Sequence, residues 1–232
     1  MTKKRCMTLI LLAVWLVALM PGIAAASPMW GWDGKSYQYA HLGSMTAGNS
    51  MPEPILWRVL SVTDDYALLL SEKALTARPF DDNSSNWGKS DIKAWLNDTF
   101  LKEAFKSDEV RAALVHDKEL GRIFLLSKGD YLNEEYGFST DANEGDKNRI
   151  AVSHANAIAH GIWATDGDLF CSHYTRTDRN KESVWQVKAG GSLSVAKFDR
   201  ENVGIRPAVC IDLSKLSVDG GDGTLEHPFE IE

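Results

Sequence analysis

The residues best suited to bind another molecule lie between positions 163 and 179. Aromatic rings offer flat stacking faces and arginines offer fork-shaped hydrogen-bond donors, and both types are enriched at binding hot spots. The alternative is that Trp163, Tyr174 and Arg176 are core residues and braces of a sheet. The sequence therefore predicts a candidate binding set with both interpretations open: Trp163, Tyr174, Arg176, Asp178 and Arg179.

The histidines make a weak case for a metal site. His154 and His160 are six residues apart, which on a helix places them about 120° away from a common face. A solvated or helix-capping role is therefore favoured for both. Cys171 and His173 would share one face of a strand, but two ligands do not complete a zinc site. We predict no metal and no cofactor.

Cys171 and Cys210 are the two cysteines that remain once an N-terminal export signal is removed. In an oxidising compartment two cysteines that meet will pair, whereas cysteines that lie apart remain inert core residues. Pairing depends on geometry that a sequence does not contain. Both alternatives, a Cys171–Cys210 disulfide and two separate thiols, stay open.

Oxygen-bearing side chains alternate between positions 141 and 148, as they do in calcium-binding loops. The glutamate that closes an EF-hand loop at its twelfth position is missing, so a plain acidic surface loop is favoured. The chain also lacks a Gly-x-Ser-x-Gly elbow, a phosphate-binding glycine loop and a dinucleotide fingerprint. We therefore predict no catalytic residues.

Short apolar runs predict the strands that must position these residues. The runs at 55–62 and 66–71 are separated by three polar residues, which is typical of a β-hairpin. Further strands are predicted at 37–42, 123–126, 169–176, 183–188, 193–198 and 203–213.

Serines that can cap helix N-termini predict the helices. Ser90, Ser107 and Ser127 each stand shortly before an acidic residue, and acidic side chains stabilise the first turn of a helix. Helices are predicted at 90–100, 107–114, 127–137 and 153–161. Because helices gather in the first half of the chain and strands in the second, we predict an α+β domain.

Residues 1–26 have the order of a cleavable export signal. Three cations at positions 3–5 precede an apolar run that ends at Pro21, well short of the about 20 residues that span a bilayer. Cleavage is predicted after Ala26. We expect an exported, periplasmic or extracellular product without a membrane span.

The remaining segment, 27–232, is long enough for a single globular domain. Removing the three signal cations from 25 leaves 22 Lys and Arg against 32 Asp and Glu, a net charge of −10 with neutral histidines. An acidic chain without a basic stripe repels phosphate backbones. We predict no nucleic-acid partner.

Six short motifs occur in order along the chain: Trp57-Arg58-Val59-Leu60, Ala67-Leu68-Leu69-Leu70-Ser71, Trp95-Leu96-Asn97, Phe124-Leu125-Leu126-Ser127, Tyr174-Thr175-Arg176-Thr177 and Gly204-Ile205-Arg206-Pro207-Ala208. Together they resemble a bacterial family of uncharacterised exported domains, domain-of-unknown-function family 6273. The resemblance covers a core at about 37–213, followed by a C-terminal tail at 214–232.

The resemblance implies a C-type-lectin-like fold, in which a twisted antiparallel sheet is flanked by short helices and the two chain ends pair. Formylglycine-generating enzymes share this scaffold, and a loop-rich face carries the function; residues 163–179 would lie there. Those enzymes bind copper through two close cysteines, whereas Cys171 and Cys210 lie far apart in this sequence. The resemblance thus implies a fold but no reaction.

We therefore expect a non-enzymatic exported domain that recognises a protein or a glycan of the cell envelope or exterior. The alternative is an enzyme related to the formylglycine-generating group with an unrecognised site. A third interpretation is a module that supports envelope assemblies without a small ligand.

Overall fold

The computed structural model describes residues 29–48, 50–164 and 169–232. The predicted export signal and its cleavage site lie outside these residues. The described chain combines three sheets with a few short helices, which confirms the α+β prediction. Within the described ranges, none of the helices has the length and apolar character needed to cross a membrane.

The largest sheet has seven strands in the order β14-β15-β1-β2-β3-β13-β6. Its first and last segments along the chain are neighbours, because β1 and β15 are parallel and pair Ala40 with Phe229. The predicted hairpin is confirmed as β2 and β3. The strands are β1 (Tyr39–Met45), β2 (Glu53–Val62), β3 (Tyr66–Ser71), β6 (Ile123–Leu125), β13 (Pro207–Asp212), β14 (Val218–Asp219) and β15 (Phe229–Ile231).

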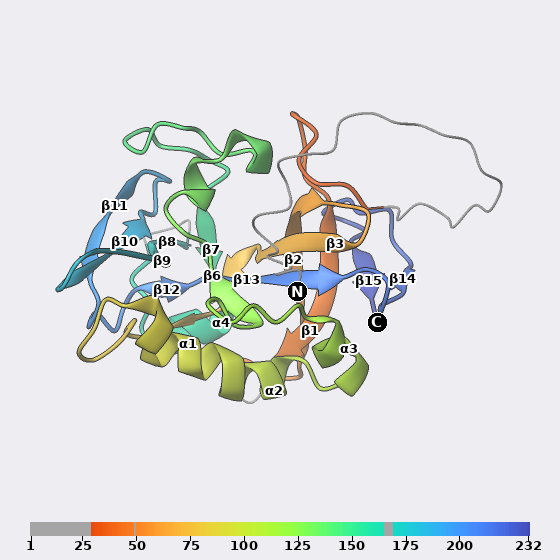
Figure 1. Cartoon of the computed structure of the whole chain (residues 1–232), viewed down its shortest axis with the longest axis horizontal. Coiled ribbons are helices and arrows are strands. Elements are labelled where there is room, and N and C mark those ends of the chain that lie inside the picture. Colours follow the sequence, from red (N-terminus) through yellow and green to blue (C-terminus); the bar gives the residue numbers. More distant parts are fainter. Residues whose placement is uncertain (1–28, 49, 165–168) are drawn as a thin grey trace.

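Two smaller sheets, of five and three strands, have the orders β11-β10-β9-β12-β5 and β4-β7-β8. Figure 1 shows the five-stranded sheet on the opposite side of the molecule from β14 and β15. Their strands are β4 (Lys73–Ala74), β5 (Thr76–Ala77), β7 (Ala151–Ser153), β8 (Phe170–Cys171), β9 (His173–Asn180), β10 (Ser183–Val187), β11 (Leu193–Lys197) and β12 (Gly204–Ile205).

The predicted strands at 169–176 and 203–213 are each divided, because the chain passes from one sheet to another within them. Ser172 separates β8 from β9, and Arg206 separates β12 from β13. Arg206 is fully buried at this crossing. Its guanidinium donates to the carbonyl oxygens of Ser71 (2.8 Å) and Arg149 (3.0 Å), so it ties three segments together.

The helix predicted after Ser90 is confirmed, with the Ser90 hydroxyl accepting from the backbone N–H of Lys93 at 3.3 Å. α1, a π-helical segment and α2 follow one another without a break and form one helical rod beneath the sheets (Figure 1). The helices are α1 (Asp91–Trp95), the π-helical segment Leu96–Phe100, α2 (Leu101–Ala104), α3 (Asp108–Ala113) and α4 (Ala155–Ala159), with 3-10 turns at Trp87–Lys89, Asp130–Leu132 and Glu134–Tyr136.

The prediction of one helix at 127–137 is wrong, because the structure has two short 3-10 turns there. Ser127 and Asp130 do cap each other: the Asp130 N–H donates to Ser127 Oγ at 3.0 Å and the Ser127 N–H to Asp130 Oδ2 at 2.7 Å. They open a single 3-10 turn, because Asn133 has extended backbone angles and starts a separate turn that ends at Gly137. The division into early helices and late strands is also wrong, since five strands precede α1 in the described part of the chain.

One hydrophobic cluster joins the two larger sheets and the helical rod. Trp57 of β2 is fully buried and donates its indole N–H to the carbonyl of Leu42 at 2.8 Å. Phe80, which follows β5, contacts Trp87 and Tyr174 with ring centroids 6.2 Å and 5.8 Å apart. Aromatic contacts of this kind fix the loop after β5 to the five-stranded sheet.

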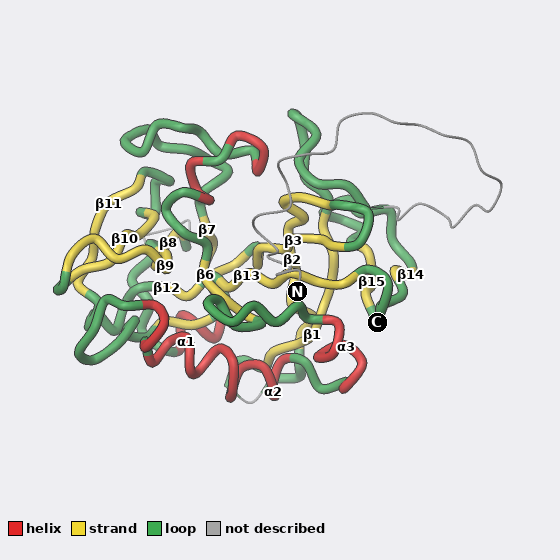
Figure 2. Tube along the Cα trace, in the orientation of Figure 1, coloured by secondary structure: helices red, strands yellow, loops and turns green. Residues whose placement is uncertain are grey.

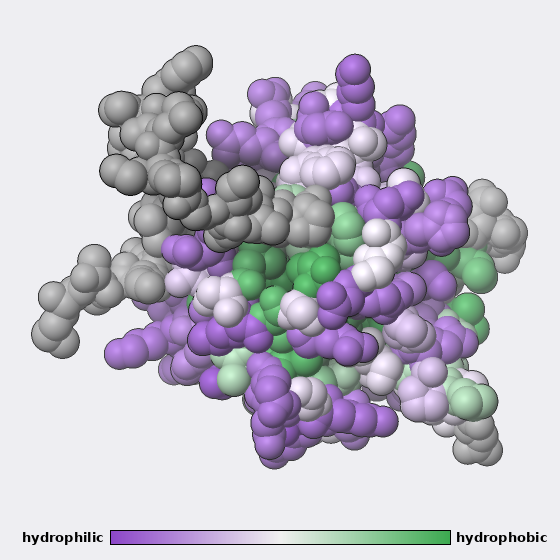
Figure 3. Space-filling model, turned by 90° about the vertical axis from the view of Figure 1, so that its right-hand side faces the viewer, coloured by the Kyte–Doolittle hydropathy of each residue, from purple (hydrophilic) through white to green (hydrophobic). Residues whose placement is uncertain are grey.

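Loops connect most of the short elements, and α1, α2 and α3 lie along one edge of the molecule, while further helical turns lie on the opposite side (Figure 2). Figure 3 faces the side on which β14 and β15 lie. There the described surface is mostly hydrophilic and surrounds a small hydrophobic area. A largely polar surface is expected for a chain in which 25% of the residues are charged.

Candidate functional site

The five residues predicted for binding are not brought together into one site. Tyr174 is fully buried, and its hydroxyl donates to the carbonyl of Lys197 at 2.7 Å. Burial raises the pKa of this phenol well above its usual range. The structure thus supports the core alternative for Tyr174.

Arg176 is also a brace. Its Nη1 donates to Asp130 Oδ2 and to the carbonyl of Leu125, both at 2.7 Å, and the two charged side chains are 11% and 7% exposed. The ion pair fastens β9 to the capped turn that follows β6. Because the guanidinium is engaged on the protein side, Arg176 has little capacity for a ligand.

The other three residues of the predicted set are exposed, but no two of them line the same hollow. Trp163 is 74% exposed and lines a hollow of about 320 Å³ with Lys188 and Arg200. Asp178 lines another one, of about 470 Å³, with Arg176. Arg179 is exposed on β9 and lines neither of these.

Cys171 is a free and fully buried thiol in β8, and its sulfur lies 3.6 Å from the carbonyl oxygen of Ala151. Because Cys171 is free, it does not form a disulfide with Cys210, which lies in β13 of a different sheet. Burial raises the pKa of the Cys171 thiol. A buried protonated thiol is a poor nucleophile and a poor metal ligand.

The histidines take structural positions. His154 caps α4, where its Nδ1 accepts from the backbone N–H of Asn156 at 3.1 Å, so the helix predicted at 153–161 starts after His154. His173 is fully buried, with Nε2 3.0 Å from the hydroxyl of Tyr131. Among the described residues, no three His, Cys, Asp or Glu side chains lie close enough to hold a metal ion.

The acidic stretch at 141–148 uses its oxygens for its own hydrogen bonds. Asp146 accepts from the backbone N–H groups of Ser139 and Asn148, both at 2.8 Å. Asp141 accepts from the N–H of Asn143 at 2.8 Å. This arrangement matches the favoured interpretation of a plain surface loop.

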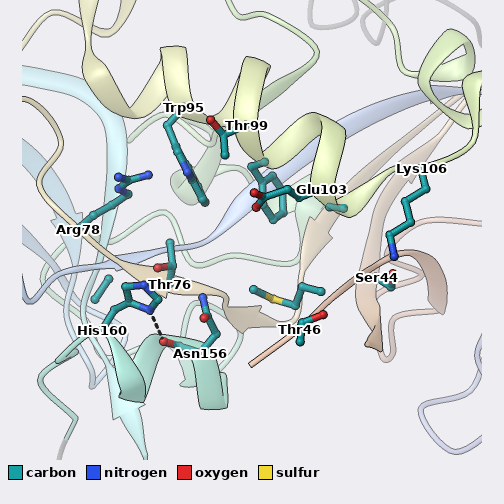
Figure 4. A pocket seen from close by; sticks show the side chains of 14 residues that line it. Ser44, Thr46, Thr76, Arg78, Trp95, Thr99, Glu103, Lys106, Asn156 and His160 are labelled. Carbon is teal, nitrogen blue, oxygen red and sulfur yellow. Dashed lines mark hydrogen bonds between the residues drawn. The ribbon is translucent and has the colours of Figure 1, made fainter. Parts of the chain in front are cut away.

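A pocket of about 580 Å³ combines charged, aromatic and neutral polar side chains in its lining. This pocket was not predicted from the sequence. We call it the helix pocket. The end of β1, the loop after β5, the helical rod and α4 enclose it (Figure 4). Gly43 lets β1 approach the rod, because a Cβ at this position would lie 2.7 Å from the carbonyl oxygen of Ala104. Its volume is within the range of small-molecule sites.

Arg78 and Trp95 form one end of the helix pocket. The guanidinium carbon of Arg78 lies 4.5 Å from the centre of the Trp95 ring. Figure 4 shows Trp95 projecting from the rod beside Thr99, with Arg78 facing it. Burial lowers the pKa of Arg78, and the nearby charge of Asp91 acts in the opposite direction.

The other charged residues of the helix pocket lie farther along it. Lys106 and Ser44 are at the far end from Arg78 in Figure 4, and Glu103 lies between Trp95 and Lys106. His160 closes α4, with its Nδ1 2.7 Å from the carbonyl oxygen of Asn156. A carbonyl can only accept, so Nδ1 donates, and Nε2 of the neutral ring is the acceptor.

Neutral hydrogen-bonding groups also line the helix pocket, from the Arg78 end to the Ser44 end. They come from four separate parts of the chain, and each offers a hydroxyl or amide: Ser44, Thr46, Thr76, Thr99 and Asn156. The helix pocket can therefore both donate to and accept from a polar ligand along its length.

A sequence model of one family, a domain of unknown function (DUF6273), matches residues 64–213. The chain belongs to this family. No curated protein and no solved structure matches it. The match to DUF6273 includes five of the six motifs and starts after the first, which lies in β2.

Most of the helix pocket lies within the DUF6273 match, including Arg78, Trp95 and Asn156, whereas Ser44 precedes it. Sequence reasoning missed this site because its residues come from distant segments and none belongs to a recognised catalytic pattern. Trp95 lies in the helix predicted at 90–100, and the structure shows it half-buried and lining the pocket, while its helix neighbours Ile92 and Leu96 are buried.

Proposed function

We propose that this DUF6273 domain is a non-enzymatic recognition domain that binds a small glycan in the helix pocket. One observation carries the proposal: a pocket of about 580 Å³ lined by hydroxyl and amide side chains from separate elements. Sugars carry many hydroxyls in fixed directions, and the donors and acceptors of this lining can form hydrogen bonds with them.

A folded protein partner suits this pocket less well than a glycan. A stable protein interface buries about 800 Å² on each partner around exposed aromatic or arginine anchors. In the helix pocket, Trp95 instead contacts other residues of the protein: its ring centroid lies 5.2 Å from that of Phe100, and the guanidinium of Arg78 lies over its ring. The concave shape and polar lining favour a ligand of a few sugar units.

Export of the domain is part of the same proposal. The cations at 3–5, the apolar run and the predicted cleavage after Ala26 support delivery to a periplasm or to the exterior, where glycans of a bacterial envelope are present. N-terminal sequencing of protein exported from cells that express the full chain tests this; we expect Ser27 as the first residue, and a retained Met1 would contradict export by cleavage.

We also propose a C-type-lectin-like scaffold. The parallel pairing of β1 with β15, near the two ends of the described chain, supports it, as do short helices beside a largely antiparallel sheet. An experimental structure compared with lectin-like domains is the test. The absence of a common strand order would overturn this assignment and leave the α+β description in place.

Binding is tested with an array of envelope and extracellular glycans, followed by titration of hits while Trp fluorescence is recorded. Thr99→Leu fills the pocket and removes a hydroxyl at an exposed helix position, so we expect loss of binding with an unchanged melting temperature. Asp98→Leu is the matched control, because Asp98 is the preceding helix residue but does not line the pocket. Equal loss in both variants, or no glycan bound, would overturn the proposal.

A further inference from the structure

We infer that the glycan bound in the helix pocket is acidic and that Arg78 binds its carboxylate. This inference rests on the proposed glycan-binding function and adds the chemical class of the ligand. It starts from two observations: Arg78 is a half-buried cation in the lining of the pocket, and its guanidinium does not pair with an acidic side chain in the described part of the chain.

Arg78 differs from the buried arginines of the domain. Among the described residues, those arginines donate hydrogen bonds to protein oxygens: Arg58 to Glu72, Arg149 to the carbonyl of Tyr131, Arg176 to Asp130 and Arg206 to the carbonyl of Ser71. The Arg78 guanidinium has no hydrogen bond or ion pair in the described part of the chain; its contact is the Trp95 ring. Its N–H groups are therefore free for a ligand.

The stacking on Trp95 prepares Arg78 for a planar anion. A guanidinium held against an aromatic face keeps its plane fixed while its N–H edges stay open. A carboxylate matches two of these N–H groups with two oxygens, and such bidentate pairs are stronger than neutral hydrogen bonds. Because the orientation is already set, less side-chain entropy is lost on binding.

The backbone that carries Arg78 is also fixed. The Arg78 N–H donates to the carbonyl of Val203 at 3.4 Å, and two residues later the Phe80 N–H donates to the carbonyl of Phe198 at 2.8 Å. The carbonyl of Phe80 in turn accepts from the N–H of Ile92 in α1 at 3.1 Å. Arg78 and Trp95 are thus held by the same framework.

Partial burial makes an anion at this position favourable. Burial lowers the pKa of Arg78, which means that its charged form loses hydration. The exposed carboxylate of Asp91 opposes this effect from outside the pocket but forms no ion pair with Arg78 among the described residues. A ligand carboxylate would restore the lost interaction.

The remaining charges favour one negative charge rather than two. Besides Arg78, the charged lining consists of Glu103 and Lys106, one charge of each sign, so the pocket has a net charge of one positive unit when His160 is neutral. His160 in its neutral form adds an acceptor. A carboxylate matches a single guanidinium, whereas a phosphate with close to two charges calls for a second cation beside Arg78. This favours a sugar acid over a sugar phosphate.

The test uses protein expressed from the full-length chain and a glycan array that contains matched members. Each uronic or sialic acid glycan is printed with its carboxyl methyl ester, its neutral parent and a phosphorylated counterpart. We expect the carboxylated members to bind and the esters and neutral parents to bind at least about tenfold more weakly, since a charge-assisted hydrogen bond is lost. Equal binding of the neutral parents, or binding of the phosphorylated members alone, would overturn the inference and leave the proposed function intact.

Variants assign the effect to Arg78. Arg78→Met keeps an unbranched stem and removes the donors, and we expect about a 10- to 100-fold loss of affinity for acidic glycans. Arg78→Lys keeps the positive charge but lacks the forked pair of donors. Its affinity for acidic glycans should lie between those of the wild type and Arg78→Met. Lys181→Met, an exposed cation in the β9–β10 turn, is the control and should leave affinity unchanged.

Melting temperatures of all variants separate folding from recognition. If Arg78→Met is destabilised, the Arg78→Lys variant and the methyl esters still report on the carboxylate contact. Undiminished affinity of Arg78→Met for acidic glycans would overturn the inference. An array on which nothing binds would instead overturn the proposed function itself.

Discussion

Arg176 and Asp130 form a buried ion pair, with Nη1 of the arginine 2.7 Å from Oδ2 of the aspartate. The same Asp130 oxygen accepts from the N–H of Ser127, so one carboxylate joins β9 to the capped turn after β6. Arg176 was predicted from the sequence as a candidate ligand-binding residue. Its ion pair with Asp130 instead makes it part of the structural framework.

Arg176→Ala is expected to destabilise the domain by about 3 kcal/mol or more, because it leaves the charge of Asp130 buried without its partner. Urea unfolding followed by tryptophan fluorescence measures the change. Asp178→Ala, two residues along β9 and exposed, is the control and should stay within about 0.5 kcal/mol of the wild type. A stable Arg176→Ala variant would contradict the role of a brace.

His173 predicts a dependence of stability on pH. Burial, and next the charge of Arg206, lower its pKa well below the usual range, while the interaction of the ring with the backbone carbonyl of Cys171 acts in the opposite direction. The unfolded chain takes up a proton near pH 6.5 that the folded chain excludes. Stability is therefore full above about pH 6.5 and falls as the pH drops below it, by up to about 1.4 kcal/mol per pH unit.

The measurement is the free energy of unfolding of wild type and His173→Gln between pH 5 and 7.5. His154, whose pKa burial also lowers, is present in both proteins and cancels in the comparison. We expect a shallower loss of stability on acidification in the variant. Identical slopes would show that His173 does not exclude the proton.

Cys171 should resist thiol reagents in the folded protein. Its side chain is fully buried and its pKa is raised, so the reactive thiolate is scarce and shielded. Iodoacetamide followed by peptide mass analysis should find Cys171 unmodified under native conditions and modified in urea. Rapid native labelling would show that the three-stranded sheet opens readily.

The sequence predicted the elements whose signals are local. Alternating or apolar runs located β2, β3, β6, β10 and β11 to within two residues at either end, and Ser90 and Ser107 cap helices as expected because the capping bond spans three residues. Residues 169–176 and 203–213 were each predicted as one strand, although the structure has two strands in each range. The strand-like pattern continues where the chain passes from one sheet to the next, so the sequence does not reveal the change. Arg206 at one such change is recognisable only from the three segments it joins.

The candidate binding set was predicted from residue type, and residue type does not determine burial. Tyr174 and Arg176 are well suited to binding in chemistry, yet their partners Lys197 and Asp130 lie 23 and 46 residues away in the chain. The helix pocket was invisible for the same reason. Arg78 and Trp95 become neighbours only when the loop after β5 is fixed against α1.

The contact between Arg78 and Trp95 can be measured without any ligand. A double-mutant cycle of Arg78→Met and Trp95→Leu, with unfolding free energies as the readout, isolates their interaction from the loss of packing that each variant causes. The site is half-buried, so we expect a coupling energy of about 1 kcal/mol, between the values for exposed and desolvated cation–π pairs. A cycle of Arg78→Met with Trp163→Ala is the control, because Trp163 is exposed outside the helix pocket and should show no coupling. If the Arg78–Trp95 cycle also gives zero, the ring does not hold the guanidinium, and the prepared orientation on which the carboxylate contact depends is lost.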